Sequence, residues 1–351
     1  MGLRRIGVEI AERRAPENLK FWARYPLLIL KRSRFSKRPV NGPPYFFVPE
    51  FRQKDVPLAR FLALWGGRKV VFDPLAARYE TKIVDWRRKP ADSPSAWWNK
   101  KIDDAAFRLA GLILADAAAH GEYYARMYGL DPAKIAVLPL GYNDEIFEKR
   151  GAAQSNDPET FSVLFFGSFL PLHGADVIVE AARFVAAADP RIRFVMLGEG
   201  QTLPAANAAA DAAGLRNIAF LGRRPVRVLP SAIAAADLCL GIFGRTEKAR
   251  RVVPHKIFQS MAMGKAVVTA RTPAVEEFFA DRKNIILCDE PLAESLAAAI
   301  LTLKHDRAMR DRLAKNGYDL VRRDFSPEAV ARRLVDIVER HFGRFEDPRS
   351  L

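Results

Sequence analysis

The sequence predicts an α/β protein with two parallel-sheet domains, and three observations support this prediction. The chain has 351 residues, about twice the usual size of one domain. Its hydrophobic fraction of 49% and charged fraction of 28% are typical of a globular protein with buried cores. In the second half, short apolar runs alternate with helical stretches of about 10–15 residues, a rhythm typical of β-α-β units around a parallel sheet.

The C-terminal part has the clearer rhythm, and we expect a Rossmann-like domain over residues 160–325. Its apolar runs predict strands at 161–166, 191–197, 217–221, 238–243, 266–270 and 284–288. Almost continuous helix follows from 292 to 342. Ser326 and Pro327 are typical of a helix start, and residues 326–351 are expected to form a C-terminal helix that packs back across both domains. Glycines follow several strands, at the edge where open parallel sheets bind ligands.

Residues 1–150 predict a second, abbreviated Rossmann-like domain. Strands are expected at 44–49, 69–72, 111–115 and 135–138, with helices near 57–64, 97–110 and 117–128. In this assignment Trp97 and Trp98 are packing residues, and His120 is a surface or packing histidine rather than a catalytic one. The polar stretch 151–159 has no apolar periodicity and predicts a linker between the domains.

Composition and motifs exclude several classes of protein. Two cysteines are too few for a disulfide framework or a cysteine-rich zinc module, and five scattered histidines argue against a bound metal. The sequence contains no dinucleotide fingerprint after a strand, no Walker A motif and no H-E-x-x-H helix. Its apolar runs are shorter than the roughly 20 residues of a membrane-spanning helix, and its start does not resemble a signal peptide. We therefore expect no cofactor and a cytoplasmic location.

Positive charge is concentrated near the start of the chain. The net charge is +15, and residues 1–60 contain 14 Lys or Arg against five Asp or Glu. Residues 20–38 combine seven basic residues with four aromatic ones and no acidic residue. This mixture predicts peripheral contact with an anionic membrane surface. A solvated basic face is the plainer alternative. Nucleic acid is not expected as a partner, because no binding motif accompanies the charge.

Several motifs, taken in order, resemble GT-B glycosyltransferases of family 4, also called glycosyl transferases group 1. They are LPLGYNDEIF at 138–147, FGSFLPLHG at 166–174, LGEG at 197–200, FLG at 220–222 and MAMGKAVV at 261–268, followed by Glu276 and Glu277. The resemblance covers about residues 110–342. It implies a GT-B architecture with two Rossmann-like domains facing a cleft, the nucleotide-sugar donor on the C-terminal domain and the acceptor on the N-terminal one.

The resemblance also implies a set of donor-binding residues. A loop that opens onto a helix N-terminus suits a diphosphate, because free backbone N–H groups and the helix dipole favour an anion. Lys256 is expected to supply positive charge to this site, with Arg251 or Lys248 nearby. Lys256 and Glu277 are assigned catalytic roles. The expected donor-binding residues are Gly167, Ser168, His173, Gly174, Gly198, Gly200, Phe243, Gly244, Arg251, Gln259 and Glu276.

The sequence departs from the family pattern at four places. Ser168 and His173 stand where the family usually has Arg and Lys. Of two family glutamates eight positions apart, the second falls on Gln259 and the first on Arg251, unless an insertion makes Glu247 the equivalent. The opening strand, Gly-rich loop and helix of the first domain have no counterpart in residues 1–14.

The fourth departure is the loss of a histidine at the end of a central strand in the first domain. Asp73 occupies a comparable place, where it would orient an acceptor or donor hydroxyl as a catalytic residue. A plain turn-forming role before Pro74 is an equal alternative.

The expected activity is that of a retaining, metal-independent glycosyltransferase of the hexosyltransferase type. It would move a sugar from a nucleotide-sugar donor to a saccharide or lipid-linked acceptor, in the synthesis of envelope or surface polysaccharide. Retention is implied by the resemblance alone. The alternative is a degenerate, non-catalytic member that binds a nucleotide or a polysaccharide.

Overall fold

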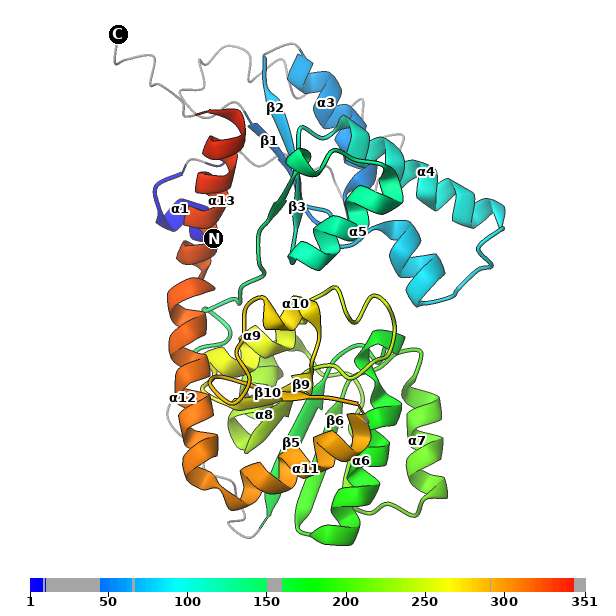
Figure 1. Cartoon of the computed structure of the whole chain (residues 1–351), viewed down its shortest axis with the longest axis vertical. Coiled ribbons are helices and arrows are strands. Elements are labelled where there is room, and N and C mark those ends of the chain that lie inside the picture. Colours follow the sequence, from blue (N-terminus) through cyan, green and yellow to red (C-terminus); the bar gives the residue numbers. More distant parts are fainter. Residues whose placement is uncertain (9, 11–44, 65–66, 150–159, 291, 344–351) are drawn as a thin grey trace.

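Two separate parallel β-sheets organise the chain (Figure 1). The computed structural model describes residues 1–8, 10, 45–64, 67–149, 160–290 and 292–343. The predicted membrane segment 20–38 and the predicted linker 151–159 lie outside the described residues. The expected α/β class with two parallel sheets is confirmed.

The C-terminal sheet has six strands in the order β10-β9-β8-β5-β6-β7, all of them paired in parallel. They are β5 (Phe161–Phe166), β6 (Ile192–Leu197), β7 (Ile218–Phe220), β8 (Leu238–Leu240), β9 (Ala266–Ala270) and β10 (Ile286–Cys288). The sequence predicted each strand within three residues at either end. Alternate side chains of β5 enter opposite cores, because successive residues of a strand point to opposite faces.

Helices cover both faces of this sheet, as the near-continuous apolar strands require. One core lies under α6 (Ala175–Ala188), α7 (Leu203–Ala212) and α11 (Leu292–His305). The other lies under α8 (Leu229–Ala235), α9 (His255–Ala262), α10 (Pro273–Glu276) and α12 (Arg307–Asp324).

The N-terminal sheet has four parallel strands in the order β1-β2-β3-β4. They are β1 (Tyr45–Val48), β2 (Lys69–Phe72), β3 (Leu112–Ala115) and β4 (Ile135–Val137). One face packs under α3 (Val56–Leu64), α4 (Pro94–Leu109) and α5 (Ala118–Tyr128). A π-helical turn, Glu80–Asp85, which the sequence did not predict, follows β2 and leads toward α4.

The last helix, α13 (Pro327–Phe342), covers the other face of the N-terminal sheet. Ser326 caps it by accepting a hydrogen bond from the Ala329 backbone nitrogen, as the Ser-Pro signal predicted. Figure 1 shows α12 and α13 running along one side of both halves of the molecule. At the start of the chain, α1 (Gly2–Arg5) packs on α13, and Arg5 forms a 2.8 Å ion pair with Glu328.

The packing role expected of Trp97 and Trp98 is wrong. Both lie on the outer face of α4, with 59% and 58% of their surfaces exposed, and their rings stack on each other. The buried face of α4 carries smaller or polar residues instead, together with Phe107.

Candidate functional site

The turn between β5 and α6 is the centre of the candidate site. It runs through the 3₁₀ turn Pro171–His173 to Gly174, whose φ of +65° is the left-handed conformation that favours glycine. The side chain of Ser168 is exposed, whereas Phe169 is fully buried beneath the turn. Helix α6 begins directly after Gly174, so its free N–H groups face the same region.

Glycines at the end of β6 allow a second backbone to touch this turn. Gly198 has a φ of +140°, and a Cβ atom there would lie 1.7 Å from the Gly167 carbonyl oxygen. Gly200 has a φ of +154°, and its Cβ would lie 1.7 Å from the Ser168 carbonyl oxygen. Only glycine fits at either position, so the LGEG motif is explained by close approach of two loops.

The segment after β8 closes the turn from the other side. The Phe243 backbone nitrogen donates to the His173 carbonyl oxygen, and the Gly244 nitrogen donates to the Leu172 carbonyl oxygen, both at 3.1 Å. A Cβ atom on Gly244 would lie 2.5 Å from the Leu172 carbonyl group. The side chain of Phe243 is fully buried in the hydrophobic core, so this residue reaches the turn through its backbone.

Lys256 points into the turn from the first turn of α9. Its Nζ lies 3.9 Å from the centre of the Phe165 ring and would lie 2.8 Å from a Cβ atom at Gly167. The residue is only 6% exposed, and its Nζ has no hydrogen-bond partner among the described residues. Burial lowers the pKa of this amine well below its usual value. An unpaired buried amine is costly unless an anion joins it, so the site is suited to a negatively charged group.

His173 lies beside Lys256 and adds a hydrogen-bond donor. Burial, with a smaller contribution from the Lys256 charge, lowers the pKa of His173 well below its usual value, which favours the neutral ring. Its Nδ1 accepts a 3.2 Å hydrogen bond from the Leu170 backbone nitrogen. The neutral ring therefore carries its proton on Nε2.

Asp73 is placed at the carboxyl end of β2, in the N-terminal half. Its Oδ1 accepts a 3.1 Å hydrogen bond from the Leu75 backbone nitrogen, so the turn-forming role left open by the sequence is present. Burial raises the pKa of Asp73 to about 6, and the carboxylates of Glu50 and Asp116 add to the increase. A carboxyl group with this pKa changes its protonation near neutral pH, which suits a group that handles a hydroxyl proton.

Glu277 directly follows α10 and reaches the N-terminal half. Its Oε2 accepts a 2.7 Å hydrogen bond from the backbone nitrogen of Ala118, the first residue of α5. Glu276, beside it, is exposed and forms a 2.9 Å ion pair with Arg271. Gln259 lies one turn beyond Lys256 on α9 and is half-buried. The structure therefore gathers the glycines, His173 and Lys256 at one point, whereas Glu276 is engaged elsewhere.

Arg251 and Lys248 also contact the N-terminal half. Arg251 Nη2 lies 2.9 Å from Glu80 Oε1, and the Lys248 Nζ donates to the Thr81 hydroxyl at 2.8 Å. Glu80 Oε2 lies 3.1 Å from His120 Nε2, and His120 Nδ1 lies 2.5 Å from Asp116 Oδ1.

Glu80 and Asp116 were not predicted as functional residues from the sequence. The only local signal was the Asp116–His120 spacing of four, which brings two side chains together at the start of a helix.

Among the described residues, no group of three or more His, Cys, Asp or Glu side chains is arranged to hold a metal ion. The helices in that part of the chain include none long and apolar enough to cross a membrane.

Comparison with curated proteins finds similarity to sugar-transferring enzymes. The chain is 27% identical over 201 residues to the D-inositol 3-phosphate glycosyltransferase of Segniliparus rotundus, covering 54% of this chain and 44% of that protein. It is 27% identical over 181 residues to the lipopolysaccharide core biosynthesis glycosyltransferase LpsE of Rhizobium meliloti, covering 50% of this chain and 49% of that protein. The chain thus spans about half the length of the curated relatives it matches.

Solved structures share the fold at low sequence identity. Anabaena HepE, crystallised with UDP and glucose, superposes with a TM-score of 0.66 at 17% identity, covering 89% of this chain and 81% of that one. Sucrose-phosphate synthase from Thermosynechococcus elongatus gives a TM-score of 0.67, also at 17% identity, covering 94% of this chain and 80% of that one. Residues 146–320 match the family described as glycosyl transferases group 1. The order of the motifs, the two parallel sheets and this match agree, and the chain belongs to the group 1 glycosyltransferases and has the GT-B fold.

Proposed function

We propose that this chain is a retaining, metal-independent hexosyltransferase. It moves a sugar from a nucleotide-sugar donor to a saccharide or lipid-linked acceptor in the synthesis of envelope or surface polysaccharide. The observation that carries the proposal is the buried Lys256 amine beside the Gly167 turn, which has no hydrogen-bond partner within the part of the chain that the structure describes. Crystals of Anabaena HepE with UDP, and with UDP-glucose, support a nucleotide-sugar donor for a protein of this fold.

In this proposal the donor diphosphate lies against the β5–α6 turn. The backbone N–H groups at the start of α6 and the Nε2 proton of neutral His173 donate hydrogen bonds to its oxygens. Lys256 binds as an ammonium, because a nearby anion restores the charged form of the amine. Negative charge grows on the departing diphosphate during transfer, and these fixed donors stabilise it without a metal ion.

The acceptor then approaches from the N-terminal half, where Asp73 lies. The hydroxyl oxygen of the acceptor forms a bond to the anomeric carbon of the donor sugar, on the face from which the phosphate leaves. The bond from that carbon to the phosphate oxygen breaks, and the hydroxyl proton passes to a donor phosphate oxygen. Asp73 orients the hydroxyl, and Glu277 lies between the donor side and the first turn of α5.

Calorimetric titration with UDP, GDP, ADP and CDP tests this proposal, each with and without Mg²⁺. We expect one nucleotide to bind equally well in both conditions, and Lys256→Ala to weaken that binding strongly. The matched control is Lys315→Ala, because Lys315 is an exposed lysine on α12 paired with Asp319. Absence of binding to all four nucleotides would contradict the proposed donor site.

A non-catalytic role is the second candidate, and specific residues favour it. Ser168, Arg251 and Gln259 replace residues that the family usually has at the donor site. Release of labelled sugar or free nucleotide from a radiolabelled donor separates the two candidates. A chain that binds nucleotide but releases neither product from any donor offered would be a binding protein.

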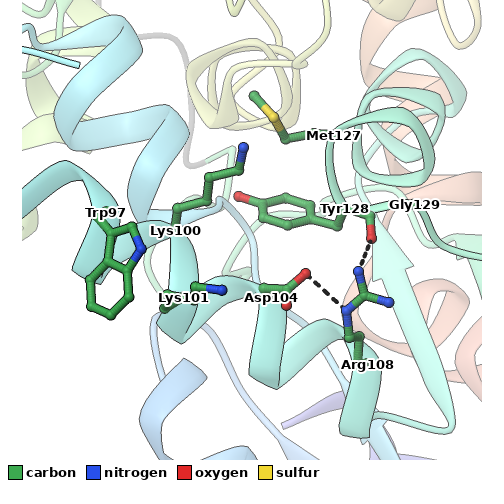
Figure 2. Close-up of a pocket in the computed structure, with 8 residues that line it drawn as sticks. All are labelled: Trp97, Lys100, Lys101, Asp104, Arg108, Met127, Tyr128 and Gly129. Atoms are coloured by element: carbon green, nitrogen blue, oxygen red, sulfur yellow. Dashed lines mark hydrogen bonds and ion pairs between the residues drawn. The ribbon is translucent and has the colours of Figure 1, made fainter. Parts of the chain in front are cut away.

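A peripheral contact with an anionic membrane completes the proposal, as expected from residues 20–38. The outer face of α4 supports it, because Trp97 and Trp98 are exposed there beside Lys100, Lys101 and Arg108. A groove of about 500 Å³ lies between α4 and the end of α5, and Figure 2 shows the side chains that line it. Its lining residues are Trp97, Lys100, Lys101, Asp104, Arg108, Met127, Tyr128 and Gly129. Indole rings and cations together favour the interface of an anionic bilayer.

Co-sedimentation with phosphatidylglycerol and phosphatidylcholine vesicles tests the contact. We expect binding to the anionic vesicles alone, weakened by Trp97→Ala with Trp98→Ala and by alanine at Lys31, Arg32 and Arg34. The matched control replaces Leu221 and Val226 with serine, since both are comparably exposed in the C-terminal half. Equal sedimentation of all variants with the anionic vesicles would contradict the proposed membrane contact.

A further inference from the structure

We infer that Arg251 is a positioning residue for the proposed donor site, held in place by Glu80 of the N-terminal half, and does not itself bind the donor. The inference rests on the proposed function. It gives Arg251 a role that differs from the donor contact expected from the family resemblance. It also gives a role to Glu80, His120 and Asp116, which the proposed reaction leaves unused.

The four residues form a continuous chain of charges, which we call the ion chain. Asp116 Oδ1 lies 2.5 Å from His120 Nδ1, and His120 Nε2 lies 3.1 Å from Glu80 Oε2. The other oxygen, Glu80 Oε1, lies 2.9 Å from Arg251 Nη2. The first three belong to the N-terminal half: Asp116 directly follows β3, His120 lies on α5, and Glu80 lies on the π-helical turn. Arg251 belongs to the segment between β8 and α9. The last contact therefore crosses between the two halves.

The ion chain is buried, which makes it costly to open. The side chains of His120 and Glu80 have no exposed surface, and that of Arg251 is 11% exposed. Each Glu80 oxygen already has a partner, and the Arg251 guanidinium lies 4.0 Å from the centre of the Tyr123 ring. Turning Arg251 toward a donor would leave the Glu80 carboxylate buried without this cation, which is strongly unfavourable.

The segment that carries Arg251 also touches the β5–α6 turn. Ala249, Ile242 and Val252 form a small apolar cluster with Leu170 and Leu172 of that turn. Earlier in the segment, Phe243 and Gly244 donate backbone hydrogen bonds to the turn. One side of the segment is thus fixed to the proposed phosphate site, and the other side is fixed to the N-terminal half.

Lys248 forms a second contact between this segment and the π-helical turn. Its Nζ bonds to the Thr81 hydroxyl, and the residue is 7% exposed. Glu80 and Thr81 are neighbours on the π-helical turn, so two consecutive residues hold two cations of the donor-side segment. The arrangement fixes the segment at two points, and a fixed segment holds the turn in the shape that receives the diphosphate.

The test compares Glu80→Gln, Arg251→Lys and the double variant by calorimetric titration with UDP. A positioning role predicts that each single variant weakens UDP binding by about tenfold, and that the double variant is no weaker than either one, because both changes open the same contact. If Arg251 bound the donor directly, for example through its buried Nε, which has no partner among the described residues, Arg251→Lys would weaken UDP binding while Glu80→Gln left it unchanged or tighter. That result, or unchanged binding in all variants, would overturn the inference.

Hydrogen exchange separates this test from the proposed function. We expect Glu80→Gln to accelerate amide exchange in residues 246–252, across the interface from the substitution, and to leave α6 unchanged. The matched control is Arg183→Lys, because Arg183 forms an exposed 2.6 Å pair with Glu180 within α6. If the wild-type chain binds no UDP, the proposed function fails, and this exchange decides the inference alone. Unchanged exchange in 246–252 would overturn it. Glu80→Asp replaces Glu80→Gln if the latter does not fold.

Discussion

The carboxylate of Glu277 accepts a 2.7 Å hydrogen bond from the backbone nitrogen of Ala118, across the interface between the two halves of the molecule. Ala117, at the N-cap of α5, offers no side-chain acceptor to the free N–H groups of this helix. Glu277 supplies one from the C-terminal half, and its negative charge also suits the positive end of the helix dipole. The residue that family resemblance assigns to the donor is thus also a contact between the N-terminal and C-terminal halves.

Replacing Glu277 is expected to loosen this contact. Glu277→Ala should lower the free energy of unfolding by about 1 kcal/mol, the usual effect of losing a helix cap, whereas Glu277→Gln keeps an acceptor oxygen and should lower it by less. Urea unfolding measures both. The control is Glu276→Ala, which removes an exposed ion pair with Arg271 and should change stability by less than about 0.5 kcal/mol. An equal effect of Glu276→Ala and Glu277→Ala would contradict the capping role.

The glycines of the LGEG motif give a second prediction. Alanine at Gly198 or Gly200 would place a Cβ atom 1.7 Å from a carbonyl oxygen of the β5–α6 turn. We expect each substitution to cost more than about 2 kcal/mol of stability and to abolish UDP binding, because the turn must move.

The control for the glycine variants is Gly214→Ala. Gly214 also has a positive φ, +63°, but apart from its chain neighbours no atom of the described residues lies within 4 Å of a Cβ atom built there. Gly214→Ala should lower the free energy of unfolding by only about 1 kcal/mol and leave UDP binding intact. If Gly198→Ala still binds UDP, the end of β6 does not contribute to the proposed donor site.

Short-range patterns account for the parts of the fold that the sequence predicted. The β2 and β9 strands occupy the predicted 69–72 and 266–270, because an apolar run bounded by turn residues determines a buried strand locally. The glycine at 198 is visible in the sequence, but the reason for it is a tertiary contact, because the Gly167 carbonyl oxygen leaves no room for a Cβ atom there. Local sequence was sufficient wherever a residue's role depended on its immediate neighbours.

Long-range contacts account for what the sequence did not predict. Glu80 and Arg251 are 171 positions apart, and nothing near either residue indicates its partner. The side chains of Trp97 and Trp98 have the chemistry of packing residues, but only the placement of α4 on the sheet determines which of its faces is exposed. The environment of a carboxylate or an indole can be assigned only once the tertiary structure is known.

Asp73 gives a prediction about pH. Its folded-state pKa of about 6 lies above the usual value of 3.8, so the folded protein binds this proton more tightly than the unfolded chain does. The contribution of Asp73 to stability is therefore most favourable below pH 4 and decreases as the pH rises from about 4 to 6. Asp73→Asn removes the buried charge and should melt at a higher temperature than the wild type at pH 8, with a smaller difference at pH 5.

Thermal melting at the two pH values measures the effect of Asp73. The control is Asp311→Asn, because Asp311 lies on α12 with 65% of its side chain exposed, so that this variant removes no buried carboxylate. A melting temperature of Asp73→Asn that is unchanged or lower at pH 8 would contradict a raised pKa at this position.

Lys256 gives the prediction closest to the proposed chemistry. Burial lowers the pKa of its amine, which has no hydrogen-bond partner among the residues described, and a bound diphosphate favours the ammonium again. Binding of UDP should therefore take up protons from the solution. At pH 8 the diphosphate itself is fully ionised, so its own titration adds little. Calorimetry in buffers of different ionisation enthalpy measures the number of protons taken up.

Lys256→Met separates the lysine from other sources of protons. This variant should bind UDP weakly and without proton uptake, and it should melt at a higher temperature because it no longer buries an unpaired amine. Lys315→Ala, which changes an exposed lysine, should retain the uptake of the wild type. If proton uptake persists in Lys256→Met, the proton is taken up by His173, the neighbouring group whose pKa is also lowered by burial. Lys256 would then contribute shape to the turn, and the charge that stabilises the leaving diphosphate would have to come from another residue.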